Sequence, residues 1–405
     1  MSSHKRLSIC YAAPGQNFLP SAGPTRNVLN LANALSQWAD VTVAFRSVPH
    51  ESFDSSKYKV IAIEPEAAAS IASKDDNATR GLHPFRHMSY CRRLWCFSQQ
   101  QAGSYDVVLE KGWRLSGYLL NGFRRSGVPG VLVENNVHQW SEPLTSLQAL
   151  AKYMFHFAAH RVANRCTRRA AAVIAETQEM KTLLVEHRRL PPDRIEVVGL
   201  GVDHAAFRPM DQRAARKCLD VPGDALLLLY VGGMDEYHDL EPVIEALAVS
   251  GQPRVELHAV GDGEYRVRCE EKAARGRLSA RFYGHVDHSL IPRYIAAADL
   301  CIAPYRTSAC YNGILPFSTL KIPEYMACGR AVASVPSGPI ERLIEDGVSG
   351  FLFPNEVSAW KSFLKRLPSR EQLGQMGAAA AKAVDSVSWE KTAMRYLQVC
   401  ERLTA

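Results

Sequence analysis

Short apolar runs alternate with amphipathic segments along the chain. The first apolar run, residues 6–15, ends in Pro-Gly, which is typical of a buried parallel strand that leads into a loop. Residues 25–38 carry apolar side chains at a helical period, and residues 40–46 form the next apolar run. This β–loop–α–β opening predicts an α/β fold with a doubly wound sheet.

The same alternation continues through the first half of the chain. The stretch from 66 to 104 is rich in Ala and Ser and then basic, and it predicts a loop followed by a helix near 86–102. Further strands are expected at 59–64, 105–112, 129–136, 170–177 and 194–202.

The second half repeats this architecture without repeating the sequence. Residues 225–235 form a strongly apolar run that ends in two glycines, and residues 240–250 follow as an amphipathic helix. More strands are expected at 255–265, 279–286, 298–305 and 330–336, and the chain ends in a helix without a following strand.

The pattern therefore predicts two Rossmann-like domains with a junction near 200–212. We expect a first domain at 1–203, a second at 204–385, and a C-terminal helix in 386–405 that packs back toward the first. Ligands of doubly wound sheets bind at the carboxyl ends of the strands. The residues directly after strands are therefore the candidates for chemistry.

Composition fits a globular enzyme. The chain has 405 residues, 47% hydrophobic and 22% charged, with a formal net charge of +7. That balance suits an anionic substrate or an anionic membrane surface. The ten cysteines include no C-x-x-C pair and no Cys/His cluster with zinc spacing, so we expect buried free thiols in a reducing compartment and no bound metal.

Targeting signals are not apparent in the sequence. The apolar part of the N-terminus is too short for a signal peptide, and no stretch approaches the ~20 apolar residues of a transmembrane helix. We expect a cytoplasmic protein. Residues 151–172 are basic and contain Tyr, Met and Phe, so this helix either packs one face on a sheet or docks peripherally on an anionic membrane.

Glycines follow several of the expected strands. Gly232 and Gly233 separate a strand from a helix, and Gly261 lies in a Gly-Asp-Gly turn. Such turns let a ligand approach the backbone, although a tight turn without a ligand reads the same. His285 and Val286 follow the next strand, where a base could stack or form hydrogen bonds.

The stretch FSTLKIPEYMACGRAVAS, residues 317–334, places a base and an acid at the start of a helix. Ser318 is expected to cap that helix, and Lys321 and Glu324 are expected to share a face. As an exposed pair they would contribute only ~0.2–0.5 kcal/mol. Alternatively, Lys321 could bind a phosphate while Glu324 accepts hydrogen bonds from a ribose diol.

Several motifs together resemble one family. The chain resembles family 4 glycosyltransferases (glycosyl transferases group 1), which have the GT-B fold. In the second half the resemblance rests on LKIPEYMACGRAVASVPSGPIERLIEDGVSGFLF, VGDGE and VGLGVDHAAFRP, and in the first half on YDVVLEKGWRLSGYLL and VIAETQEMKTLL. The match covers nearly the whole chain. It implies two Rossmann-like domains facing across a cleft, with acceptor binding in the first and donor binding in the second.

The resemblance also implies the reaction. A retaining, hexosyltransferase-type enzyme would move a sugar from a nucleotide-diphosphate sugar to an acceptor hydroxyl in polysaccharide or glycoconjugate biosynthesis. No metal or other cofactor is implied, and no nucleic acid. The acceptor would be a sugar, a lipid-linked molecule or a small molecule. A lipid-linked acceptor suits peripheral contact of the protein with the inner face of a membrane.

The family's donor residues carry over by position. Glu324 matches the second Glu of the E-x7-E motif, which binds ribose hydroxyls, and Lys321 matches a lysine of one subgroup. His285 and Val286 match the loop that reads the base. The glycines after the strands, Ser318 and His238 complete the donor site that the resemblance implies.

Two further residues are implied for the first domain. Gly23 matches a glycine loop near the diphosphate and the acceptor. Asn135 stands near the strand end where many members place an active-site histidine, so it is paired with Lys321 as a catalytic candidate.

Four positions depart from the family pattern. Pro316 replaces the first Glu of E-x7-E, Gly233 replaces an Arg, and His238-Asp239 replaces Lys-Gly. Lys321 and His238 are expected to take over the missing positive charge. The departures leave two alternatives open: a catalytically silent GT-B protein that binds a sugar or a partner, and a nucleotide-sugar epimerase.

Overall fold

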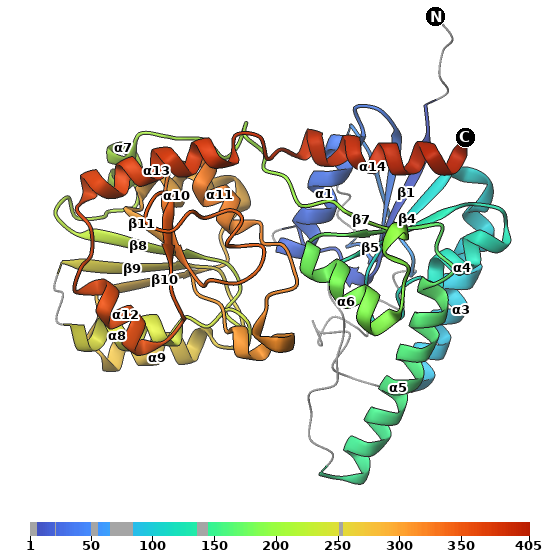
Figure 1. Ribbon diagram of the computed structural model, residues 1–405, viewed down its shortest axis with the longest axis horizontal. Coiled ribbons are helices and arrows are strands. Elements are labelled where there is room, and N and C mark those ends of the chain that lie inside the picture. The colour runs from blue at the N-terminus through green and yellow to red at the C-terminus, as the bar shows by residue number, and fades with distance from the viewer. Residues whose placement is uncertain (1–5, 21, 50–55, 65–83, 136–144, 251–253) are drawn as a thin grey trace, which may run out of the picture. The chain divides into compact units, whose positions relative to one another are not determined.

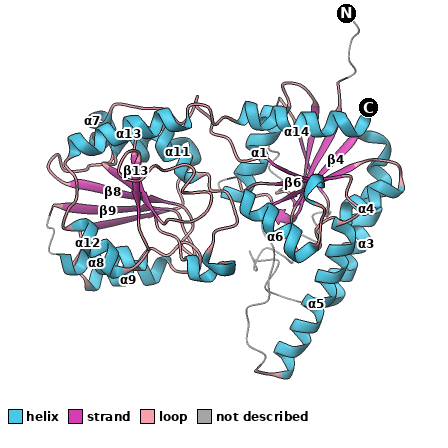
Figure 2. Cartoon of the chain, in the orientation of Figure 1, coloured by secondary structure: helices cyan, strands magenta, loops and turns pink. Residues whose placement is uncertain are grey.

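The structure, a computed structural model, describes residues 6–20, 22–49, 56–64, 84–135, 145–250 and 254–405. It divides into two compact units, Met1–Gly199 with Trp389–Ala405, and Leu200–Ser388 (Figure 1). Each unit is a parallel sheet with helices on both faces, so the predicted α/β class with two Rossmann-like domains is confirmed. Figure 2 shows the two sheets in magenta.

The first unit contains a seven-stranded sheet in the order β3-β2-β1-β4-β5-β6-β7, and all neighbouring pairs are parallel. Each predicted strand of the first half is present. Their bounds are β1 (Ser8–Asn17), β2 (Asp40–Ser47), β3 (Lys59–Ala62), β4 (Val107–Lys111), β5 (Gly130–Glu134), β6 (Ala172–Ala175) and β7 (Ile195–Val197).

The helices of this unit include the one expected near 86–102, which is α3, whereas residues 65–83 of the same stretch lie outside the described residues. The C-terminal helix α14 packs on α1. The helices of the first unit are α1 (Gly23–Leu35), α3 (Pro84–Gln101), α4 (Tyr118–Arg125), α5 (Leu147–Thr167), α6 (Gln178–Arg188) and α14 (Trp389–Thr404).

The second unit contains a six-stranded parallel sheet in the order β10-β9-β8-β11-β12-β13. The strands are β8 (Leu226–Val231), β9 (Val255–Val260), β10 (Ala280–Gly284), β11 (Leu300–Ala303), β12 (Ala331–Ser334) and β13 (Gly350–Leu352). The sequence pattern did not predict β13, a three-residue edge strand whose place follows from its pairing with β12.

Seven helices of the second unit cover this sheet. They are α7 (Gln212–Cys218), α8 (Glu241–Ser250), α9 (Arg266–Arg275), α10 (Ile291–Ala297), α11 (Lys321–Ala327), α12 (Val357–Leu364) and α13 (Arg370–Val384). Among the helices of the described residues, none combines the length and apolar character that crossing a bilayer would require.

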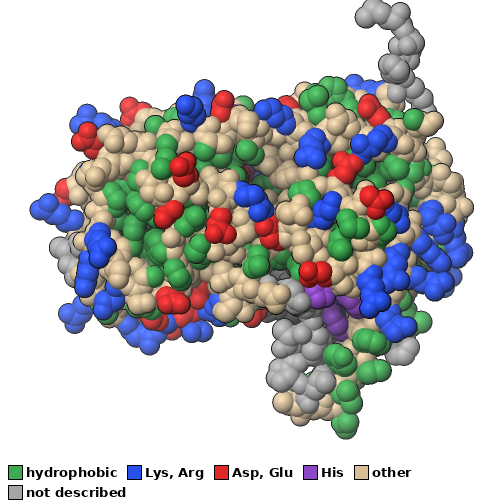
Figure 3. Space-filling view, viewed as in Figure 1, with side chains coloured by type: hydrophobic (Ala, Val, Ile, Leu, Met, Phe, Trp, Pro, Cys, Tyr) green, Lys and Arg blue, Asp and Glu red, His purple; other side chains and the backbone are tan. Residues whose placement is uncertain are grey.

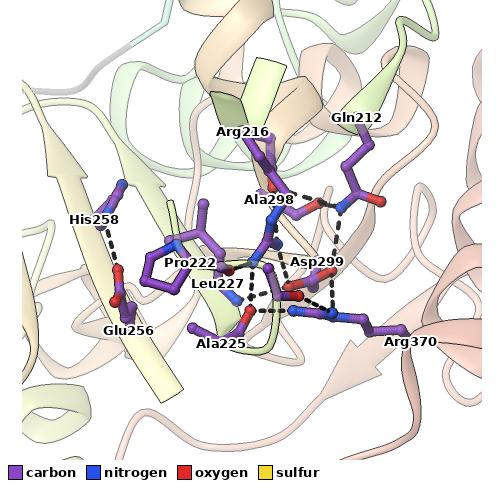
Figure 4. A network of polar contacts seen from close by, with 12 residues as sticks. Gln212, Arg216, Pro222, Ala225, Leu227, Glu256, His258, Ala298, Asp299 and Arg370 are labelled. Carbon is purple, nitrogen blue, oxygen red and sulfur yellow. Dashed lines mark hydrogen bonds and ion pairs between the residues drawn. The ribbon is translucent and has the colours of Figure 1, made fainter. Parts of the chain in front are cut away.

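A buried carboxylate fixes the amino ends of the two central strands of the second sheet (Figure 4). Asp299, directly before β11, accepts a hydrogen bond from the backbone N–H of Leu227 in β8 at 2.7 Å. The same carboxylate oxygen forms an ion pair with Arg216 of α7 at 2.9 Å. Arg370 of α13 reaches the other carboxylate oxygen at 3.3 Å. The opposite, carboxyl ends of β8 and β11 are thereby held in a defined position.

Chain order reverses between β1 and β4 in the first sheet and between β8 and β11 in the second. In open parallel sheets the helices then leave on opposite faces, and a crevice opens at the carboxyl ends of the two strands. The fold therefore marks the loops after β8 and β11 in one unit, and those after β1 and β4 in the other.

Candidate active site

The loops after β8 and β9 touch through their backbones. The N–H of Gly232 donates to the carbonyl of Val260 at 2.9 Å, and the N–H of Gly261 donates to the carbonyl of Gly284 at 2.7 Å. Gly261 has φ 127°, and a Cβ there would collide with the carbonyl oxygen of Gly232. Only glycine fits this position, so the turn brings backbone amides to the edge of the sheet without side chains in front of them.

Lys321 projects from the start of α11 onto the end of β8. Its ammonium donates to the Tyr230 hydroxyl at 3.3 Å and lies 4.6 Å from the centre of the Tyr230 ring and 5.4 Å from that of Tyr305. Gly232 has φ 145°, and a Cβ at this position would collide with the same ammonium. The glycine after β8 therefore provides the space in which the lysine lies, and two aromatic faces stabilise its charge.

Burial lowers the pKa of Lys321 to about 7, although the nearby carboxylates of Asp235 and Glu324 favour the charged form. At neutral pH the amine is thus divided between its two protonation states. An anion bound beside it would favour the ammonium and raise its pKa. The site is therefore suited to a ligand whose negative charge the protein has to match.

Asp235 and His238 form a compact turn after β8. One carboxylate oxygen of Asp235 accepts hydrogen bonds from the backbone N–H of Tyr237 at 2.9 Å, the backbone N–H of His238 at 3.0 Å and Nδ1 of His238 at 2.9 Å. Burial alone would raise the pKa of Asp235, but these hydrogen bonds and the histidine hold it at about 2. Asp235 is therefore an anion throughout the physiological range.

The charge of His238 differs from the expectation that this residue replaces a missing cation. Burial and the neighbouring Lys321 ammonium lower its pKa, so at pH 7 the imidazole is neutral. The centre of its ring lies 5.3 Å from that of the Tyr305 ring, and the two ring planes are tilted by 52°. His238 can donate or accept a hydrogen bond in this site, but the positive charge comes from Lys321.

Hydrogen bonds fix α11 against the strand ends. The Tyr325 hydroxyl accepts from the N–H of Val231 at 2.7 Å and donates to its carbonyl at 3.2 Å. Tyr305, directly after β11, pairs its hydroxyl with that of Thr319 at 2.7 Å. Because both tyrosines are fully buried, the position of the Lys321 backbone depends on packing as well as on hydrogen bonds.

The prediction that Ser318 caps the helix is wrong. The helix begins at Lys321, its cap position is Leu320, and no side chain there forms a capping hydrogen bond. Thr319, which bonds Tyr305, orders the residues before the helix instead. Glu324 is only 9% exposed, so the alternative of an exposed surface pair with Lys321 is also wrong.

A second basic residue, Arg306, lies at the same edge. Its Nε and Nη2 donate to one carboxylate oxygen of Asp239 at 3.0 and 2.7 Å, and its backbone N–H donates to the carbonyl of Tyr237 at 2.9 Å. The other oxygen of Asp239 accepts from the N–H of Glu241 at the start of α8 at 3.2 Å. The aspartate that departs from the family pattern therefore joins the loops after β8 and β11.

Sequence reasoning missed four members of this cluster: Tyr230, Asp235, Tyr305 and Arg306. Asp235 and Tyr305 carried a usable signal, because each lies within four residues after the end of an apolar strand. Tyr230 lies inside its strand and reads as core. His285 and Val286 follow β10, two strands away from β8; His285 is exposed and Val286 packs on the core.

The remaining predicted residues belong to the first unit. Asn135 directly follows β5 and is half-buried, and Gly23 begins α1, with open space where a Cβ would stand. Both lie at the carboxyl edge of the first sheet. The structure thus places the predicted donor-binding residues in the second unit except Gly23, which lies with the catalytic candidate Asn135 in the first.

Two buried ion pairs lie at this second edge. Lys111, the last residue of β4, forms an ion pair with Glu176, which also accepts from Nδ2 of Asn27 at 3.3 Å. Arg188 pairs with Glu134 at 2.5 Å and donates to the Thr167 hydroxyl at 2.9 Å. Within the described residues, no group of three or more His, Cys, Asp or Glu side chains is arranged to bind a metal ion.

Two family models match successive parts of the chain. Residues 22–206 match glycosyltransferase family 4, and residues 225–369 match glycosyl transferases group 1. A D-inositol 3-phosphate glycosyltransferase from Geodermatophilus obscurus is 29% identical over 322 residues, which are 73% of this chain and 66% of that protein. The same enzyme from Thermomonospora curvata is 28% identical over 73% of this chain and 71% of that protein.

Solved structures share the fold over almost the full length. Sucrose-phosphate synthase from Thermosynechococcus elongatus superposes with a TM-score of 0.75 at 19% identity, covering 98% of this chain and 99% of the other. HepE from Anabaena, solved in complex with UDP and glucose, gives 0.74 at 18% identity over 98% and 100% of the two chains. The chain belongs to the family 4 (group 1) glycosyltransferases and has the GT-B fold.

Proposed function

We propose that this protein transfers a sugar from a nucleotide-diphosphate sugar to an acceptor hydroxyl, with retention of configuration. The observation that carries the proposal is the position of Lys321, whose ammonium lies on two tyrosine rings at the point where strand order reverses. The nucleotide diphosphate develops negative charge as its bond to the sugar breaks. A preformed cation at the switch point would stabilise that charge in the transition state.

Each site residue receives a role within this proposal. Lys321 would bind the diphosphate, the amides after Gly232 and Gly261 would approach its oxygens, and Glu324 would accept hydrogen bonds from the ribose. His285 and Val286 would contact the base. In the first unit, Gly23 and Asn135 would lie beside the acceptor and the reacting sugar, and the charge stabilisation by Lys321 requires no metal ion.

The comparisons suggest where to begin with substrates. The matched curated relatives are named for glycosyl transfer to inositol 3-phosphate, and HepE was solved with UDP and glucose. UDP-hexoses are therefore the first donors to test, and sugars, sugar phosphates and lipid-linked sugars the first acceptors. A role in polysaccharide or glycoconjugate biosynthesis and a cytoplasmic location remain part of the proposal.

Nucleotide binding is the primary test. Titration calorimetry with UDP and with GDP should give saturable binding of one of them, and a panel of nucleotide sugars should show slow release of the matching nucleotide diphosphate. Chelation by EDTA should leave that release unchanged. Folded protein that binds neither nucleotide would contradict the proposal.

A catalytically silent protein is the second candidate, because Gly233 and Pro316 replace two side chains of the family's donor site. Such a protein would bind the nucleotide sugar through Lys321 and Glu324 but release no nucleotide diphosphate. Binding without turnover across the donor panel, with a range of acceptors present, would favour it over the enzyme. Release of an epimerised donor in the absence of any acceptor would instead indicate a nucleotide-sugar epimerase.

A further inference from the structure

Three neighbouring helices of the first unit contain no acidic residue. The sequences of α3, α4 and α5 have three, two and three Lys or Arg residues respectively, and neither Asp nor Glu. Two more arginines, Arg168 and Arg169, follow α5 directly and are exposed. In Figure 3, basic side chains gather on this side of the unit. The absence of any acid from all three helices is unusual in a chain with 41 acidic residues.

The basic residues form one surface because the helices are packed together. Helix α4 contacts both α3 and α5. Arg124 of α4 donates to the side-chain oxygen of Asn121 at 3.3 Å, and Arg169 approaches the same oxygen at 3.5 Å. Arg125 stacks on the Trp95 ring of α3 at 5.1 Å. Positive charge therefore extends from α3 across α4 to the end of α5.

Helix α5 continues beyond this surface. In its C-terminal part Ala159, Ala163 and Cys166 are buried, whereas none of the described side chains from 147 to 158 is buried. These twelve residues correspond to ~18 Å of helix at ~1.5 Å per residue. Figure 1 shows this part of α5 extending away from the sheet of its own unit.

Large apolar side chains line the extended part at helical spacing. Leu147 is 87% exposed, Leu150 45%, Met154 56% and Phe157 45%. Arg161 continues the same row and lies 5.6 Å from the centre of the Phe157 ring, and the exposed Arg165 follows one turn later. We call these six residues the α5 row; it is apolar at the free end of the helix and cationic near the body.

Such a row requires a partner that is apolar at one end and anionic at the other. An isolated helix of this length is marginal in water, and a contiguous exposed apolar face favours association. A symmetric contact between two copies would pack the arginines of each row against the apolar end of the other row and provide no anion for them. Nucleic acid would satisfy the arginines but would leave Leu147, Leu150 and Met154 in water.

We infer that the α5 row docks on an anionic phospholipid bilayer. Leu147, Leu150, Met154 and Phe157 would enter the boundary between headgroups and acyl chains, and Arg161 and Arg165 would contact lipid phosphates. The exposed basic side chains of α3 and α4 would then face the membrane, whereas Arg93 of α3 is already paired with Glu64. Burial of apolar side chains and attraction between opposite charges would add together.

Co-sedimentation of the full chain with vesicles tests this inference. Vesicles of phosphatidylcholine with 30 mol% phosphatidylglycerol, about the charge density of an anionic leaflet, should bind the protein at low salt, and vesicles of phosphatidylcholine alone should not. Each membrane-facing arginine contributes about fivefold to partitioning, so Arg161→Gln with Arg165→Gln should lower it about 25-fold. Met154→Ser should weaken it several-fold at any salt concentration.

Matched variants control for charge and for surface apolarity. Arg213→Gln with Lys217→Gln removes two exposed charges from α7, and Met394→Ser removes a methionine on α14 that is 49% exposed, compared with 56% for Met154. Both should bind vesicles like the wild type, and a thermal melt of each variant confirms that it is folded.

Two results would overturn the inference. Equal binding of the wild type to neutral and anionic vesicles, or none to either, would exclude the proposed lipid contact. Concentration-dependent dimerisation in light scattering that Met154→Ser abolishes would identify a second copy of the chain, and not a bilayer, as the occupant of the α5 row.

Discussion

Two lysines lie near the switch points of the two sheets, Lys111 at the end of a strand and Lys321 at the start of a helix, and they have different surroundings. Lys111 ends β4 beside the switch point of the first sheet and is buried in an ion pair with Glu176. Lys321 follows β11 at the switch point of the second sheet and places its ammonium against a hydroxyl and two aromatic rings. The first lysine has its charge matched within the fold, and the second has its pKa lowered to about 7.

The difference separates a structural charge from a functional one. Breaking a buried ion pair leaves an uncompensated charge in the interior and is strongly destabilising. A buried amine with a lowered pKa instead reduces the stability of the fold near neutral pH, and such groups cluster at functional sites. The comparison predicts opposite consequences for the same substitution at the two positions.

The largest effect is expected for Lys111→Met. It leaves Glu176 buried without its cation and should lower the free energy of unfolding by ~3–5 kcal/mol. Thermal or urea unfolding measures this, and Lys111→Met combined with Glu176→Leu should recover part of the loss. An unchanged melting temperature in the single variant would mean that this ion pair does not stabilise the first unit.

Glu324→Ala should have the next largest effect, on ligand binding. Loss of hydrogen bonds between a carboxylate and the ribose removes ~1.5–3 kcal/mol, or about 10- to 150-fold in nucleotide affinity. The exposed Glu341 provides a matched control, because Glu341→Ala removes a carboxylate from the same unit. If both variants bind the nucleotide like the wild type, Glu324 does not contact the ribose.

Lys321→Met should change affinity without destabilising the protein. We expect about tenfold weaker binding of the nucleoside diphosphate and unchanged binding of the nucleoside, since only the former carries the charge. A loss of thermal stability comparable to that of Lys111→Met, with affinity retained, would make Lys321 structural.

The stability of Lys321→Met should also depend on pH differently from that of the wild type. The folded-state pKa of Lys321 is about 7 and its ordinary value is 10.5, so the unfolded chain binds more protons between these values. Stability contributed by this group therefore rises with pH across that window. The excess stability of Lys321→Met over the wild type should be largest near pH 7 and decline toward pH 10, as urea titrations at several pH values would show.

Sequence patterns predicted the strands well because most are apolar runs bounded by glycine or polar residues. The short edge strand β13 was missed, since its pairing with β12 comes from tertiary structure. In the site, Lys321 and the glycines were identified, but their mutual dependence was not. That Gly232 makes room for the ammonium is a contact between residues 89 positions apart in the chain.

Charge state was the least predictable part of the site. His238 was expected to replace a missing cation, but burial and Lys321 lower its pKa, which depends on neighbours that the sequence does not place beside it. The predicted cap at Ser318 failed for a related reason. Thr319 forms the hydrogen bond to Tyr305, and the helix starts two residues later than Thr319.

Calorimetric titration of UDP, or of GDP if that is the bound nucleotide, at pH 7 and pH 9 tests the role of Lys321 most directly. If the diphosphate binds the ammonium, binding must take up a proton above the pKa of about 7, and wild-type affinity should fall on the order of tenfold or more between the two pH values. Lys321→Met should bind more weakly at pH 7 and show no such fall. Equal pH dependence in the wild type and the variant would contradict the assignment of Lys321 as the cation that binds the diphosphate.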